Sequence, residues 1–333
     1  MAIGPRGIGL LSNDTLTVID TAVPVGIAAL GMLLGLGVGA HREGDHRRLA
    51  AAAVDVSLTA ALVGLGIMAL AQTMAIAAGI PLWTFALMAG VCAATSLALP
   101  EGTPSEPGDR SSRVIELEGV AAVVAGGVLL AIVREQASLA AVSLIAQASA
   151  AALVLATAGW LLLTRTRSET EQRVFTIATV LLVGGAADFL SLSALLGGLI
   201  AGLFWQRAGG EAREQMRRDV RYVQHPLLVL ILVAAGARVE MSAPAVTLAV
   251  AYTCLRTAAR TAAGWIGARA ARSGGARHTS LTCLPPGVFG VAFTLNAVRA
   301  VGPEASMLLA VAVLGTIGAD LVARLVTRGD APA

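Results

Sequence analysis

Long apolar runs separated by short polar gaps fill the chain from about residue 22 onward. About 20 apolar residues in a helix cross the roughly 30 Å hydrocarbon core of a membrane, and the backbone polar groups must be satisfied within the structure there. The pattern therefore predicts an all-α polytopic membrane protein with eleven spans. They lie near residues 22–40, 51–77, 82–100, 114–133, 138–163, 174–189, 191–206, 226–240, 245–268, 280–298 and 305–324.

The apolar run at residues 174–206 is long enough for a single helix, but polar residues interrupt it. Asp188 and the step from Ser191 to Ser193 favour a tight hairpin of two short spans. We therefore count two helices here.

The composition agrees with a membrane protein. Of 333 residues, 56% are hydrophobic and 14% are charged, whereas a soluble domain carries about 25% charged residues. This excludes disordered, collagen-like and disulfide-rich secreted chains. The three cysteines form no CxxC pair and the four histidines lack ligand spacing, so we expect no metal site and no cofactor.

The distribution of arginines among the loops indicates which side of the membrane each loop lies on. If successive gaps alternate sides, eighteen arginines fall on one side and only Arg6, Arg134, Arg238 and Arg299 on the other. Positive residues gather in cytoplasmic loops, so we expect the N-terminus outside and the C-terminus in the cytoplasm of a bacterial inner membrane. The net charge of +3 then reflects topology, not nucleic-acid binding.

Two arginines fall inside the predicted span 245–268. They are Arg256 and Arg260. Placing a charged side chain at that depth costs free energy, and such a side chain usually faces a partner or a cavity. Snorkelling of their side chains to the cytoplasmic interface is the alternative.

Six short segments carry a resemblance that spans nearly the whole chain. They are Gly4-Pro5 with residues 7–11, Ala93-Ala94-Thr95-Ser96-Leu97-Ala98, residues 192–203 (LSALLGGLIAGL), His225-Pro226 through Gly236, Arg256 to Arg260 with Gly264, Gly267 and Arg269, and Leu284-Pro285-Pro286-Gly287-Val288. In this order they resemble motifs of the monovalent cation:proton antiporter superfamily, the bacterial sodium/proton and potassium/proton exchangers.

The resemblance implies inverted repeats with two interrupted, crossing helices. The breaks are expected near residues 95–100 and 285–290, unless Pro100 and Pro285 only mark span ends. The implied organisation is an external segment, a panel or dimerisation domain, a core ion-transport domain and a cytoplasmic tail. The external segment comprises residues 1–21, and the panel or dimerisation domain comprises 22–40 with 138–240. The core ion-transport domain comprises 51–133 with 245–326, and the cytoplasmic tail comprises 327–333.

The resemblance also directs attention to Glu118, which aligns with the first of two acids in the family motif. Gly119 replaces the second acid, and Arg260 replaces the lysine of the second repeat. Glu118 lies about 10 Å from the start of its helix and Arg260 about 12 Å from the end of its span, both counted from the cytoplasmic side at 1.5 Å per residue. We therefore expect these two residues to pair.

Other polar residues are candidates beside that pair. Thr95, Ser96 and Asn296 lie at the breaks and are candidate ion ligands with Glu118. The secondary candidates, Asp55, Asp188 and Asp320, are either interfacial or part of the ion path.

The expected function is exchange of a monovalent cation such as Na⁺ or K⁺ for H⁺ by alternating access. The alternative is a degenerate, non-transporting subunit or regulator on the same fold, which Gly119 and Arg260 favour. No catalytic constellation indicates an enzyme. The resemblance implies a homodimer in the bilayer. Members of the resembled family carry one or two helices before the Gly-Pro stretch, so such helices are expected upstream of Met1.

Overall fold

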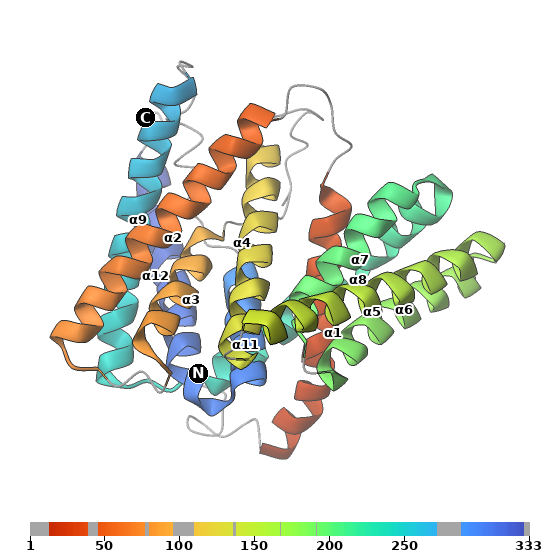
Figure 1. Ribbon diagram of the computed structural model, residues 1–333, viewed down its shortest axis with the longest axis horizontal. Helices are drawn as coiled ribbons and strands as arrows, with labels where there is room; N and C mark the ends of the chain where they lie inside the picture. The colour runs from red at the N-terminus through yellow and green to blue at the C-terminus, as the bar shows by residue number, and fades with distance from the viewer. Residues whose placement is uncertain are drawn as a thin grey trace. The chain divides into compact units, whose positions relative to one another are not determined.

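The computed structural model describes residues 13–38, 46–76, 80–95, 110–135, 138–166, 168–190, 192–271 and 288–329. This part of the chain contains eleven α-helices and one short 3₁₀ helix (Figure 1). They are α1 (Asn13–Gly37), α2 (His46–Thr73), α3 (Leu82–Ala94), α4 (Arg110–Glu135), α5 (Ser138–Arg165), α6 (Glu169–Phe189), α7 (Ala194–Ala208), α8 (Gly210–Arg238), α9 (Ala243–Ala271), α11 (Val288–Val301), η1 (Pro303–Ala305) and α12 (Ser306–Gly329).

Each of the eleven predicted spans overlaps one of these helices. The hairpin expected within residues 174–206 is present, because α6 ends at Phe189 and α7 begins at Ala194. Ser193 caps α7, accepting a hydrogen bond from the Leu196 backbone N–H at 3.3 Å.

Six of the described helices are long and apolar enough to cross a membrane: α1, α2, α5, α6, α8 and the segment from η1 into α12. Two apolar helices, α3 and α11, have only 13 and 14 residues. At 1.5 Å per residue each is about 20 Å long, shorter than the roughly 30 Å hydrocarbon core. These are the short helices that adjoin the two expected breaks.

The chain forms two compact units. The first comprises Met1–His41, Val123–Arg238 and Leu295–Val301, and the second comprises Arg42–Ala122, Val239–Thr294 and Gly302–Ala333. Helices α4 and α11 therefore each contribute one half to each unit. The assignment of panel and core domains stays a prediction, because it concerns their roles in transport and dimerisation.

In the first unit, α1 packs closely against α7. Glycines make this approach possible: a Cβ built on Gly31 or Gly198 would overlap the carbonyl oxygen of Leu195 or Ala28, respectively. Gly35 and Gly202 continue the same contact one turn further. Small residues of this kind bring helix backbones together where lipid provides no hydrophobic driving force.

In the second unit, α2, α3, α9 and α12 lie side by side (Figure 1). Here too small residues set the spacing, since Gly90 of α3 faces the Ala60 carbonyl of α2 and Gly315 of α12 faces the Tyr252 ring of α9. This packing holds α9 against α2, with α3 beside them.

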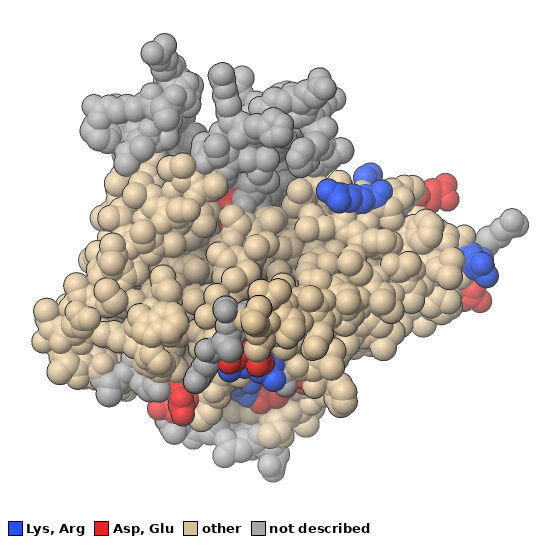
Figure 2. Space-filling model, in the orientation of Figure 1, with Lys and Arg blue, Asp and Glu red and all other residues tan. Residues whose placement is uncertain are grey.

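Large apolar side chains are exposed along α5 and α6, including Leu139, Val154, Leu182 and Phe189. The face shown in Figure 2 carries few charged atoms over its described surface, and these gather in small groups. An uncharged, apolar surface of this kind suits contact with lipid chains.

Candidate functional site

The site is built around the end of α3, which stops at Ala94. Thr95 has an extended backbone (φ −75°, ψ 136°), so the carbonyls of the last turn lose their helical partners. The Cys92 thiol donates to the Gly290 carbonyl of α11 at 3.7 Å. The end of α3 and the start of α11 therefore meet within the second unit.

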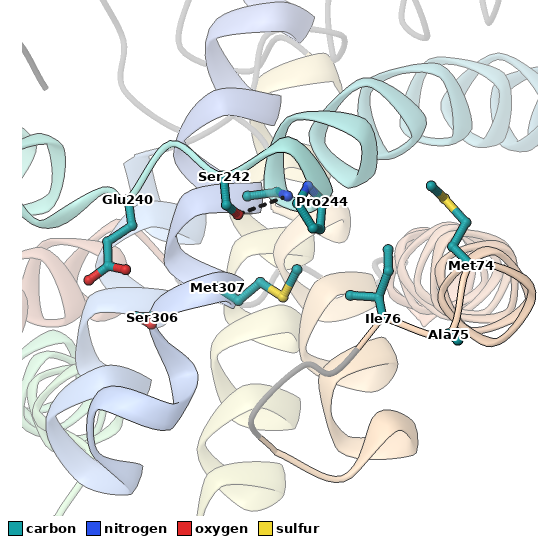
Figure 3. A pocket seen from close by; sticks show the side chains of 9 residues that line it. Met74, Ala75, Ile76, Glu240, Ser242, Pro244, Ser306 and Met307 are labelled. Carbon is teal, nitrogen blue, oxygen red and sulfur yellow. Dashed lines mark hydrogen bonds between the residues drawn. The ribbon is translucent and has the colours of Figure 1, made fainter.

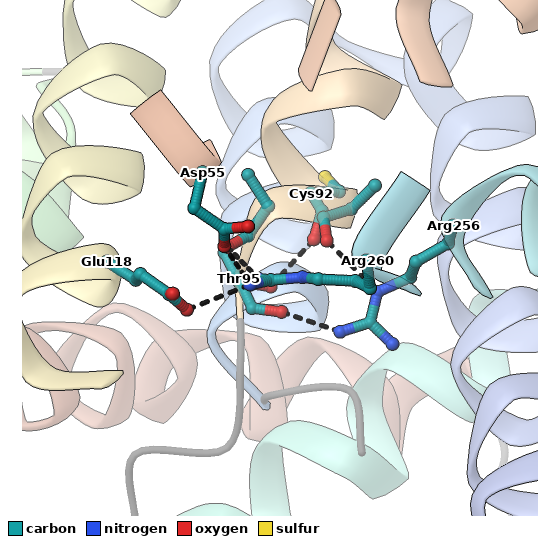
Figure 4. A network of polar contacts seen from close by, with 8 residues as sticks. Asp55, Cys92, Thr95, Glu118, Arg256 and Arg260 are labelled. Carbon is teal, nitrogen blue, oxygen red and sulfur yellow. Dashed lines mark hydrogen bonds and ion pairs between the residues drawn. The ribbon is translucent and has the colours of Figure 1, made fainter. Parts of the chain in front are cut away.

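Two arginines of α9 cap these carbonyls (Figure 4). Arg256 donates from Nε to the Ala93 oxygen at 3.0 Å and from Nη2 to the Thr95 oxygen at 2.8 Å. Arg260, one turn later, donates from Nη2 to the Ala94 oxygen at 2.5 Å. Cations stabilise the negative end of a helix dipole. The arginines are 1% and 2% exposed, so the snorkelling alternative is wrong for both.

Arg260 also binds two carboxylates. Its Nη1 lies 2.9 Å from Glu118 Oε2 on α4 and 2.6 Å from Asp55 Oδ2 on α2. The expected Glu118–Arg260 pair is thus present, and Asp55 joins it. Because both carboxylate oxygens bind the same nitrogen, they lie at most about 5.5 Å apart.

The four charged side chains form a balanced buried group. Arg260 contacts both carboxylates, and Arg256 donates to the neighbouring carbonyls of Ala93 and Thr95. Glu118 is 2% exposed, and the Asp55 side chain is 19% exposed. A buried charge is tolerated where it is paired and hydrogen-bonded. Asp55 is the more accessible of the two carboxylates.

The remaining predicted site residues lie in different surroundings. Thr95 is at the site, where its hydroxyl donates to the Cys92 carbonyl at 2.7 Å, whereas Ser96 lies outside the described residues. Asn296 belongs to the first unit and donates from Nδ2 to Ser193 Oγ at 3.2 Å. Asp320 pairs with Arg324 on the same exposed helix turn, at 2.8 Å.

A second polar cluster lies in the first unit. Asp20 of α1 pairs with Arg238 of α8, and Asp188 of α6 lies 2.5 Å from Arg299 of α11. These groups border a cavity of about 290 Å³, lined by Pro24, Asp188, Leu192, Ala194, Arg238, Asn296, Arg299 and Ala300. Each carboxylate in the cluster has an arginine partner.

A larger cavity, of about 380 Å³, opens in the second unit where α2 ends and α9 and α12 begin (Figure 3). Ser242 caps α9 there, accepting from the Ala245 backbone N–H at 3.3 Å. The lining is mainly aliphatic and thioether, with Glu240 as its acid. It lies at the start of α9, about 25 Å along the helix from Arg260 at 1.5 Å per residue, so it is distinct from the arginine–carboxylate group.

The sequence singles out both Asp55 and Arg256 but does not predict the contacts that they make in this site. Asp55 is ranked only among secondary candidates, although it is the acid of an otherwise apolar run. The capping role of Arg256 is not predicted either. Its spacing of four residues from Arg260 places both on one helix face, which is the signal that could have identified it.

Comparison with known proteins identifies the family. The model of the family described as "Sodium/hydrogen exchanger, transmembrane" matches residues 1–325. The chain belongs to this family. Its fold resembles the solved structure of the sodium proton antiporter MjNhaP1 from Methanocaldococcus jannaschii, with 15% identity, a TM-score of 0.63, and coverage of 98% of this chain and 88% of that chain. At this identity the likeness shows the fold alone, and no curated protein matches the chain.

Family and fold together confirm the expected class. The protein is a multi-pass membrane protein with an antiporter fold, and a cation:proton antiporter whose substrates are a cation and protons. The family is one of transporters.

Proposed function

We propose that the chain exchanges a monovalent cation for protons at Asp55 and Glu118, with Arg260 as their fixed counter-charge. The observation that carries this proposal is the binding of both carboxylates to one buried nitrogen of Arg260.

The proton must travel on a carboxylate. Arginine stays protonated in proteins, whereas a buried lysine can release its proton. Arg256 and Arg260 are therefore constant charges, and the net charge of the group changes only when Asp55 or Glu118 gains a proton or a cation. A carboxylate that has bound a proton has lost the charge that attracts the cation, so the two ligands exclude each other.

Interrupted helices can supply oxygen ligands for a cation. Oxygen atoms of carboxylates, hydroxyls and carbonyls are the ligands that hard cations prefer, and broken helices expose such atoms near the membrane midplane. Thr95 places a hydroxyl beside the end of α3, next to Gly290 of α11. We assign Thr95 a supporting role and Asp55 and Glu118 the exchange itself.

The proposal also covers orientation and assembly. The distribution of arginines supports an N-terminus outside and a C-terminus in the cytoplasm of a bacterial inner membrane. A homodimer rests on analogy with the resembled exchangers, and cross-linking in native membranes would test it.

Proton flux in proteoliposomes tests the function. The full chain is reconstituted with a pH-sensitive dye inside, and Na⁺, K⁺ or Li⁺ is added outside. We expect cation-dependent flux that falls at least 100-fold in Glu118→Gln and Asp55→Asn. Asp320→Asn is the matched control, because Asp320 is an acid on an exposed turn, and its flux should stay within twofold of the parent.

The outcomes separate the alternatives. Flux that survives both Glu118→Gln and Asp55→Asn would overturn the carboxylate mechanism while leaving the transporter. A folded, monodisperse parent chain without flux in any of the three cations would instead support the non-transporting regulator.

A further inference from the structure

The second half of α11 is grouped with the first unit. Residues Leu295–Val301 belong to that unit, and we call them the docked segment. The first half of the same helix starts at the proposed ion site, because a Cβ built on Gly290 would approach the Thr95 hydroxyl and the Cys92 carbonyl. Because α11 is one continuous helix of 14 residues, a movement of the docked segment also reaches this start.

Two side chains of the docked segment make polar contacts within the first unit. Arg299 donates from Nη2 to Asp188 of α6 at 2.5 Å and from Nη1 to the Asp20 carbonyl of α1 at 2.9 Å. Asn296 donates to the hydroxyl of Ser193, which caps α7, at 3.2 Å. These contacts join the docked segment to α1, to α6 and to the start of α7.

The same contacts border the cavity of about 290 Å³, whose lining includes Asp188, Asn296 and Arg299. The Arg299–Asp188 pair is partly accessible, with side chains 22% and 43% exposed. An ion pair that water reaches contributes little stability. Polar groups around a cavity can also bind water when their protein contacts break. Separation of the docked segment from the first unit would therefore cost little free energy.

The contact between α1 and α7 is of the opposite kind. A Cβ on Gly31 or Gly198 would overlap a backbone carbonyl of the other helix, and such close packing leaves no room for water. The Asp20–Arg238 pair also ties α1 to α8. The first unit thus combines a close-packed frame with a segment that is held through polar groups around a cavity.

The cavity lies on the side that the distribution of arginines assigns to the outside. Arg238 and Arg299 are two of the four arginines expected there, and both line the cavity, against the single acid Asp188 in its lining. Guanidiniums stay charged in proteins. A cation that approaches from outside therefore meets a net positive lining, and positive side chains of this kind act as an electrostatic barrier to cations.

We propose that the docked segment is the external gate of the exchanger. Opening of the gate breaks the contacts of Arg299 and Asn296, moves the segment away from α1, α6 and α7, and removes Arg299 from the path of the cation. The start of α11 moves with it beside the proposed ion site, which couples external opening to that site. The gate rests on the transport function and the orientation proposed above.

A reversible bridge across the gate tests the proposal. In the full chain carrying Ser193→Cys with Asn296→Cys, a short bifunctional thiol reagent joins the start of α7 to the docked segment through reducible disulfides. Cation-dependent proton flux in proteoliposomes should fall to background on bridging and return after reduction. Each sample is its own reference, so the effect of the substitutions themselves cancels. A bridge across a contact that never opens leaves transport unchanged, so unchanged flux with a complete bridge would overturn the gate.

The matched control places the same bridge beside the gate. Asp20→Cys with Arg238→Cys joins α1 to α8, two helices of the frame, without including α11. Bridging this pair should leave its flux within about twofold. An equal arrest in both pairs would show that any staple in the first unit stops transport, which overturns a specific role of the docked segment.

A second measurement needs no transport. Ala194 lines the cavity at the start of α7, and Ala201 lies two turns later on the same helix face; they are 2% and 0% exposed. A membrane-impermeant sulfonate thiol reagent is applied outside oriented vesicles, and peptide mass spectrometry measures the reaction. Because a minor open state is often about 0.1–10% populated, Ala194→Cys should react slowly but at least about tenfold faster than Ala201→Cys.

The two measurements separate the gate from the function on which it rests. Equal reaction at both positions, or reaction of Ala194→Cys only from the inside, would overturn the external gate. A parent chain without flux would overturn the proposed exchange. Outside labelling of Ala194→Cys would then still support opening of the docked segment, and its absence would overturn that opening.

Discussion

Arg299 donates a hydrogen bond from Nη1 to the backbone carbonyl of Asp20, at 2.9 Å. This carbonyl lies four residues before Pro24, inside α1. Because proline lacks the N–H that would normally bind it, the carbonyl is free to accept a side-chain donor. Arg299 thus satisfies a defect in α1 that the sequence itself creates.

This relationship predicts coupling between Pro24 and Arg299. Arg299→Gln should destabilise the protein, because the Asp20 carbonyl and Asp188 both lose a charged donor. In a Pro24→Ala background the alanine N–H can bind the carbonyl, so the same substitution should cost about 1 kcal/mol less. Thermal unfolding of the four proteins in detergent measures this cycle. Strictly additive effects would show that the proline and the arginine act independently.

A second prediction concerns the counter-charge at the proposed ion site. Arg260→Gln leaves Asp55 and Glu118 close together without their cation. Removal of one partner from a buried ion pair costs about 3–5 kcal/mol, so this variant should unfold at a markedly lower temperature. Adding Asp55→Asn and Glu118→Gln removes the two negative charges and should restore most of the loss, although transport stays absent. A triple variant as unstable as Arg260→Gln would argue that Arg260 acts mainly through the Ala94 carbonyl.

Much of this site follows from sequence, for a physical reason. The hydrophobic thickness of the membrane fixes the length and period of each span, so the helices and the relative depths of Glu118 and Arg260 can be counted along the chain. Asp55 is different, because its contact with Arg260 joins residues 205 positions apart. Its place depends on which side of α2 faces α9, and a helix that is apolar on nearly every side has no polar stripe to indicate that orientation.

The end of α3 also combines a feature that can be predicted from the sequence with contacts that cannot. The family resemblance predicts a break near residues 95–100, and α3 ends at Ala94, but the resemblance does not indicate which groups bind the last carbonyls of α3. Those donors come from Arg256 and Arg260, more than 160 positions away. Backbone groups at a helix end must find hydrogen-bond partners. The local sequence therefore implies that the last carbonyls need donors, whereas tertiary packing decides which residues supply them.

A third prediction tests competition between the two substrates. If a proton and a cation exclude each other at Asp55 and Glu118, a fall in pH should raise the apparent KM for the cation. The effect should approach tenfold per pH unit where the carboxylate is mainly protonated, while the rate at saturating cation stays constant. Initial rates in proteoliposomes over a pH series measure both. A constant KM with a falling maximal rate would instead indicate a protonation outside the binding site.

The fourth prediction compares two neighbouring glycines of α7. A Cβ on Gly198 would overlap the Ala28 carbonyl of α1, whereas a Cβ on Gly197 meets nothing within 4 Å. Gly198→Ala should therefore force α1 and α7 apart and destabilise the protein by about 1–3 kcal/mol. Gly197→Ala should be neutral, or stabilise by up to about 1 kcal/mol through helix propensity.

The two substitutions add the same methyl group one residue apart, so they share hydrophobicity, helix propensity and depth. A difference in unfolding temperature between them can only come from the side of α7 on which the methyl lies. If both alanine variants unfold together with the parent chain, α1 and α7 can separate at little cost, and the close glycine contact is not a source of stability. A lower temperature for Gly198→Ala alone would establish the α1–α7 contact as a rigid element of the first unit.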